Sequence, residues 1–205
     1  MLTVGAAGAL ILLGAGILLR GRVPGIDVWA LEVLTLDGDV GWAVTATGVV
    51  SDGLRVAAVV AAATAVGWLL WRERLNGLLP ALGYAAVFVV LASSSELLKD
   101  VFGRTHPLDA EEVSLPSTHV TMVTVGLLVA AGVLWRLTGR WHAGATIVVA
   151  LAIAATAATR VLLAEHHLTD VGATAAGYAG LALLCVGLLR YAGRPRPGRP
   201  AQAPA

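Results

Sequence analysis

Three short stretches of the sequence carry residue types that can bind and cleave a phosphate ester. They are residues 99–107, 116–119 and 159–170, and they hold four of the five histidines in the chain. Each stretch stands at the end of a long apolar run. Ionisable groups are costly at membrane depth, so their presence there indicates function.

The basic residues of these stretches predict a site for an anion. Arg104 and Arg160 carry guanidinium groups, which hold phosphate through paired hydrogen bonds, and Lys99 adds a third cation. Ser117 has the residue type of a helix N-cap, and the free backbone N–H groups at a helix start bind phosphate. A phosphate or phosphate ester is therefore the expected ligand.

The histidines predict nucleophilic and acid–base chemistry on that phosphate. His166 and Asp170 are four residues apart, so on a helix they share a face. A carboxylate bound to one imidazole nitrogen leaves the other nitrogen free to attack. His167 is three residues from Asp170, so spacing alone does not choose between the two histidines. His119, in another stretch, is a candidate acid for a leaving oxygen.

The elements that must position these residues are predicted to be membrane helices. Of the 205 residues, 58% are hydrophobic and 13% are charged, against about 25% charged in a soluble domain. The net charge of +1 argues against a nucleic-acid partner, because such proteins carry a basic excess. The single cysteine, Cys185, excludes a disulfide framework.

The hydropathy pattern predicts an all-α integral membrane bundle of six helices in one domain, residues 1–190, followed by a disordered basic tail at 191–205. No Lys or Arg precedes the first apolar run, so we expect a retained span rather than a signal peptide. Residues 23–53 are mixed and acidic, and part of them is expected to lie along the membrane surface. The expected spans are residues 2–19, 54–71, 77–97, 119–135, 143–159 and 170–189.

Basic residues predict how this bundle is oriented in the cell membrane. Segments 72–76, 136–142 and 190–199 together hold eight arginines, and in a six-span chain all three lie on one side. Positive residues concentrate on the cytoplasmic side. Both termini are therefore expected in the cytoplasm, and the three polar stretches are expected at the extracytoplasmic ends of the helices.

The three stretches resemble the signature of the type-2 phosphatidic acid phosphatase family of integral membrane enzymes. The family pattern is K-x-x-x-x-x-x-R-P, then P-S-G-H, then S-R-x-x-x-x-x-H-x-x-x-D. This chain has K-DVFGRT-H-P, P-S-T-H and T-R-VLLAE-H-HLT-D, with the same order and spacing. Three positions depart from the pattern: His106 replaces a phosphate-binding Arg, Thr118 replaces Gly, and Thr159 replaces Ser.

The resemblance implies metal-independent hydrolysis of a lipid phosphate, without a cofactor. It makes His166 a nucleophile that forms a phosphohistidine, Asp170 its support and His119 the acid. The implied substrate is a polyprenyl diphosphate or a glycerolipid phosphate whose tail stays in the bilayer. The imidazole of His106 lacks the guanidinium fork, and Arg104 is the candidate to compensate. The residues expected to hold the phosphoryl oxygens are Lys99, Arg104, His106, Ser117, Thr118 and Arg160.

Other functions stay open from the sequence. A transferase that passes the phospho-head group to another lipid or a sugar would use the same phosphohistidine. A catalytically inactive membrane scaffold would follow if the loss of Arg at position 106 were decisive, and a homo-oligomer is left open. A metal-assisted hydrolase is disfavoured because Lys99 and Arg160 repel a metal; its ligands would be His106, His119, His166 and Asp170.

Overall fold

The computed structural model describes residues 2–36, 41–109 and 111–192, and the regular elements among these residues are helices, with no strand. Thr105 and Val113 form one isolated antiparallel bridge. The all-α expectation is confirmed for this part of the chain, whereas the predicted tail lies almost entirely outside it. The elements are α1 (Leu2–Leu18), α2 (Gly25–Leu34), α3 (Gly41–Glu73), the 3-10 turn η1 (Arg74–Gly77), α4 (Leu78–Phe102), α5 (Thr118–Thr138), α6 (Ala143–Leu162) and α7 (Leu168–Ala192).

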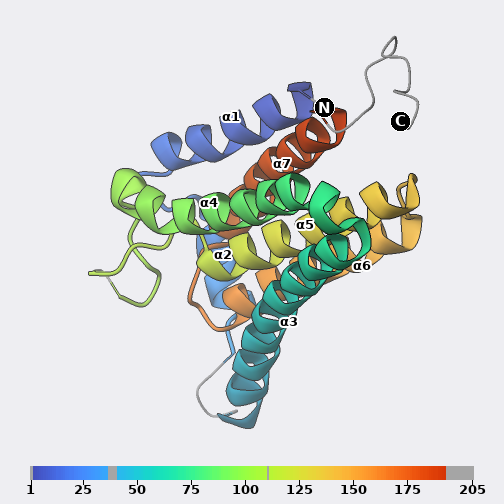
Figure 1. Ribbon diagram of the computed structural model, residues 1–205. Helices are drawn as coiled ribbons and strands as arrows, with labels where there is room; N and C mark the ends of the chain where they lie inside the picture. The colour runs from blue at the N-terminus through green and yellow to red at the C-terminus, as the bar shows by residue number, and fades with distance from the viewer. Residues whose placement is uncertain (1, 37–40, 110, 193–205) are drawn as a thin grey trace, which may run out of the picture.

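Long apolar helices indicate a membrane protein. Within the described residues, four stretches are long and apolar enough to cross a membrane: Gly41–Phe102, Thr118–Thr138, Ala143–Leu162 and Leu168–Ala192. The first stretch contains η1, where the chain turns, so α3 and α4 form two separate arms (Figure 1). The helix α1 is apolar but shorter, at 17 residues.

The helix α3 begins earlier than the apolar run at 54–71 predicts. The glycines and polar residues at 48–53, which belong to the segment expected to be mixed in character, lie inside this 33-residue helix. Packing explains the difference, because α3 lies along α5 and the side chain of Ser51 is fully buried, and tertiary contacts override weak local propensity. The first part of α3 extends beyond the other helices, with Trp42 and Val49 exposed (Figure 1).

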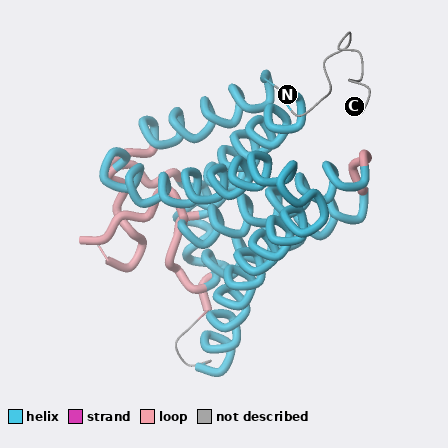
Figure 2. The backbone as a smooth tube through the Cα atoms, viewed as in Figure 1, coloured by secondary structure: helices cyan, strands magenta, loops and turns pink. Residues whose placement is uncertain are grey.

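The helix α5 forms the centre of the bundle. It packs against α3, α4, α6 and α7, and one face buries Val125, Val129 and Val133 beside the rings of Tyr84 and Tyr178. The chain enters α5 at the end of the bundle where α4 and α6 finish and α7 starts. The longer loops therefore gather on one side of the molecule (Figure 2).

The helix α1 completes the bundle by a close approach to α7. A Cβ atom added to Gly8 would stand 2.8 Å from the carbonyl oxygen of Gly177 and 2.8 Å from the Cα of Gly180. These neighbours are backbone atoms, so they cannot move aside as a flexible side chain would. Small residues at these three positions allow the two helices to pack backbone to backbone.

Candidate active site

A cavity of about 460 Å³ opens where the loops gather. Its walls come from α3, α4, α5 and α6 and from the loops that follow α4 and α6. Residues as far apart in the sequence as Arg55 and His166 therefore share one space. Six of the predicted site residues line it, namely Lys99, His106, Thr118, His119, Arg160 and His166; the other lining residues are Arg55, Glu96, Glu112, Val113 and Glu165.

Gly103 ends α4 and turns the chain toward the cavity. Its φ of +57° lies in the left-handed region, which glycine adopts without strain, and its N–H donates to the carbonyl oxygen of Lys99. The following loop closes on itself, because the N–H of His106 donates to the carbonyl oxygen of Glu112 at 3.0 Å. This fold of the loop brings His106 into the wall.

Two imidazoles lie close together in the cavity lining, edge to face. The ring centroids of His106 and His166 are 6.0 Å apart, and His166 is 6% exposed. Burial, helped by the charges of Arg160 and Lys99, lowers the pKa of His166 well below its ordinary value. Burial also lowers the pKa of His106. Both rings are therefore neutral at pH 7, the form in which an imidazole nitrogen attacks.

The cations of the cavity are each paired with a carboxylate. Lys99 Nζ lies 3.2 Å from Glu96 Oε2, and the guanidinium of Arg160 contacts Glu165. Thr118 also donates its hydroxyl to Glu96. An anion that binds here must therefore compete with these carboxylates for the cations.

His119 has a carboxylate partner that the sequence analysis missed. Its Nε2 lies 3.0 Å from Asp52 Oδ1, and Asp52 also contacts Arg55 at 3.1 Å. Asp52 was assigned to the mixed surface segment, and no motif marks it. Its spacing of three from Arg55 on a helix was the available signal. A carboxylate in this position stabilises the protonated imidazole that acid catalysis requires.

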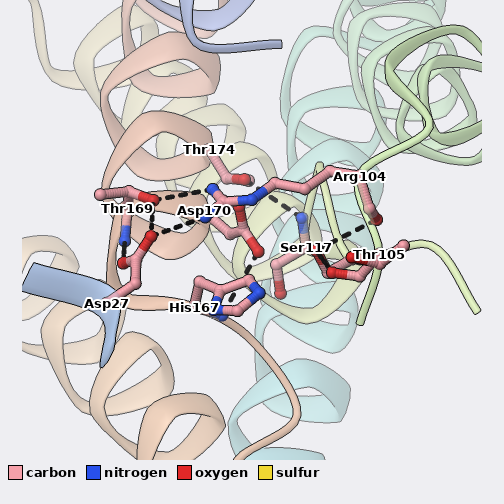
Figure 3. Close-up of polar contacts among 9 residues, drawn as sticks. Asp27, Arg104, Thr105, Ser117, His167, Thr169, Asp170 and Thr174 are labelled. Atoms are coloured by element: carbon pink, nitrogen blue, oxygen red, sulfur yellow. Dashed lines mark hydrogen bonds and ion pairs between the residues drawn. The ribbon is translucent and has the colours of Figure 1, made fainter. Parts of the chain in front are cut away.

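Arg104 lies behind the cavity wall rather than in it. The residue is 1% exposed; its Nη2 lies 2.6 Å from Asp27 Oδ2, and its Nη1 contacts Asp170 and Thr169 (Figure 3). Both arms of the guanidinium are thus held by carboxylates. The expectation that Arg104 compensates for His106 by binding phosphate does not fit this position.

Asp170 binds Arg104 and the N–H of His167, at 3.3 Å for the latter, and no hydrogen bond joins it to His166. The expected pair fails because α7 begins at Leu168. His166 precedes the helix, so the rule that residues four apart share a face does not apply. In the described part of the chain, the Nδ1 atoms of His166 and His167 are buried without a hydrogen-bond partner.

Ser117 occupies the N-cap position of α5, as expected, but its side chain makes no capping hydrogen bond. It is fully buried, its hydroxyl has no partner among the described residues, and its N–H donates to Thr174 Oγ1 at 3.1 Å. The helix start therefore meets the cavity through the next two residues, Thr118 and His119.

Comparisons with protein-family models, curated proteins and solved structures find no match for the chain. Across residues 2–36, 41–109 and 111–192, no group of three or more His, Cys, Asp or Glu side chains is arranged to hold a metal ion. The alternative ligand set of His106, His119, His166 and Asp170 is therefore not assembled, since Asp170 lies in the buried ion pair and outside the cavity lining.

Proposed function

We propose that the protein is a membrane lipid phosphatase that cleaves a phosphomonoester or diphosphate through a phosphohistidine on His166. One observation carries the proposal: the cavity is lined by residues from all three of the stretches that resemble the type-2 phosphatidic acid phosphatase pattern. Cations, a helix start and three histidines meet there, and one of them, His119, is paired with a carboxylate.

The first step is attack of an imidazole nitrogen of His166 on phosphorus. Its Nδ1 is buried, so Nε2 is the atom that a substrate in the cavity reaches. The bond from phosphorus to the leaving oxygen breaks, and His119 gives that oxygen its proton. Lys99 and Arg160 stabilise the charge on the phosphoryl oxygens as they exchange their carboxylate partners for the phosphate.

The second step is hydrolysis of the phosphohistidine. His119, now neutral, takes a proton from a water molecule that attacks phosphorus, and the bond between nitrogen and phosphorus breaks. Inorganic phosphate leaves, and His166 returns to its neutral form. Asp52 supports both steps because it holds His119 in place and stabilises its protonated state.

The six-span arrangement belongs to this proposal. The helices α1, α3, α4, α5, α6 and α7 cross the bilayer, and α2 lies at its surface. Arg72, Arg136 and Arg190 stand at the C-terminal ends of α3, α5 and α7, opposite the cavity. The rule for positive residues then puts these arginines and both termini in the cytoplasm and the cavity on the extracytoplasmic side.

The test is phosphate release by the purified protein from a panel of lipid monophosphates and diphosphates. His166→Gln should abolish release, and His167→Gln is the matched control because its ring does not line the cavity. An acid-labile phosphoprotein should form in the wild type and not in His166→Gln. Turnover that survives His166→Gln would overturn the assignment. A lipid alcohol added as acceptor would reveal transfer in place of hydrolysis.

A further inference from the structure

The short helix α2 is fastened to the back of the cavity by one buried carboxylate. Asp27 is fully buried, and its Oδ2 lies 2.6 Å from Nη2 of Arg104. Thr169 donates to the same carboxylate through its N–H at 2.8 Å and its hydroxyl at 2.6 Å (Figure 3). Burial raises the pKa of Asp27, but the hydrogen bonds from Thr169 and Arg104 outweigh it and hold the pKa below its ordinary value. The carboxylate is therefore ionised.

The contacts continue from Asp27 to the loop that carries the proposed nucleophile. Arg104 uses its other terminal nitrogen for Asp170, which in turn accepts the N–H of His167. His166 is the adjacent residue, and its own N–H donates to the carbonyl oxygen of Arg160 at 3.2 Å. A buried chain of charged hydrogen bonds thus runs from α2 to this loop.

The two carboxylates have different tasks because they approach the guanidinium from different elements. A guanidinium is a rigid planar fork, so fixing one arm fixes the direction of the other. Asp27 fixes the arm that faces α2, and the opposite arm then sets the position of Asp170. If Asp27 were neutral, Arg104 and Asp170 would still balance in charge. The arm of the Arg104 guanidinium that faces residue 27 would lose its ionic partner, and the guanidinium would be free to turn.

We propose that Asp27 is a positioning residue for the loop of His166 and His167, acting through Arg104 and Asp170. The expected effect of Asp27 on the reaction rate rests on the proposed function, whereas its expected effect on the position of the loop does not. The cationic side chains of Lys99 and Arg160 take no part in the chain of contacts through Asp27, so substrate binding should depend little on Asp27. The rate of the chemical step should depend on it strongly, because it requires the imidazole to be aligned with phosphorus.

The test compares Asp27→Asn with Glu32→Gln in the full-length purified protein. Both substitutions remove one carboxylate from α2, but Glu32 is exposed. Hydrogen exchange at residues 163–168, which do not bond Asp27 directly, should become about tenfold faster in Asp27→Asn and stay unchanged in Glu32→Gln. For a lipid phosphate, Asp27→Asn should lower kcat about tenfold to a hundredfold, the scale of a misplacement of about 1 Å, and leave KM within about twofold.

The outcomes separate this proposal from the proposed function. Faster exchange in Asp27→Asn supports the positioning role, whether or not the wild type hydrolyses a lipid phosphate. Absence of hydrolysis by the wild type would overturn the proposed phosphatase function and leave the positioning role standing. Unchanged exchange overturns the positioning role, and so does a raised KM with unchanged kcat. Arg104→Lys provides a second variant if Asp27→Asn does not fold. It keeps the charge but not the fork, and it should accelerate exchange in the same loop.

Discussion

Replacing His106 by arginine should strengthen phosphate binding. The ring of His106 lies 6.0 Å from that of His166, so a guanidinium there comes within about 6 Å of a phosphoryl group on His166. At an effective dielectric constant of about 20, two unit charges at that distance interact by about 3 kcal/mol. Glu112 and Asp109, whose charges already act on His106, would attract the new cation in the free enzyme. A net gain of about 1–2 kcal/mol remains, or about fivefold to thirtyfold in affinity.

The assay is phosphate release from a short-chain lipid phosphate in detergent micelles at pH 7.5. His106→Arg should raise kcat/KM by about that factor, mainly through a lower KM. His142→Arg makes the same substitution at the N-cap of α6, at the opposite end of the bundle, and should change neither constant. A tenfold fall in kcat/KM for a folded His106→Arg protein would refute the reasoning. His106 would then take part in the chemistry itself.

Three further results are expected. A chelator should leave phosphate release unchanged, because the cations of the cavity repel a metal; a rate that falls and returns with added divalent metal contradicts this. Arg104→Gln should lower the free energy of unfolding by about 3–5 kcal/mol, since two buried carboxylates lose their shared cation, and an unchanged Tm in detergent would show that the ion pair is dispensable. Stability should fall as pH drops from 7.5 to 5.5, because the pKa of His166 is lower folded than unfolded, so the unfolded chain binds more protons. In His166→Gln, Tm should fall less over this pH range than in the wild type. Equal dependence of Tm on pH in the two proteins would show that His166 is not the group responsible.

The sequence allowed the helices and most of the cavity residues to be predicted for one physical reason. Apolar runs mark the helices, and the motif residues stand at the ends of those runs. When consecutive helices alternate in direction, the C-terminal end of one helix and the N-terminal end of the next lie on the same side of the bundle. His119 and His166 are therefore brought together although 47 residues separate them, and Lys99 and Arg160 follow the same logic.

The partners of these residues could not be predicted, because they depend on which face of a helix turns inward. Asp27 and Asp52 sit in a segment with five acidic residues, and its local pattern does not tell which of them is buried. The partner of Asp27 lies 77 residues away in a loop. The pairing of Asp170 with His166 was wrong because α7 starts at Leu168, two residues after His166, so His166 is not on the helix that carries Asp170.

The length of the helix α3 allows the depth of the cavity in a bilayer to be estimated. From Asp52 to Arg72 it rises about 30 Å, which equals the hydrocarbon thickness of a bilayer, and about 16 Å more of helix precedes Asp52. In the proposed orientation, with Arg72 at one boundary of the hydrocarbon layer and the helix upright, Asp52 and the cavity beside it would stand at the opposite boundary, where the headgroups begin. If the proposed function holds, a lipid headgroup would reach the imidazoles from within its own leaflet, while its tail stays in the hydrocarbon layer.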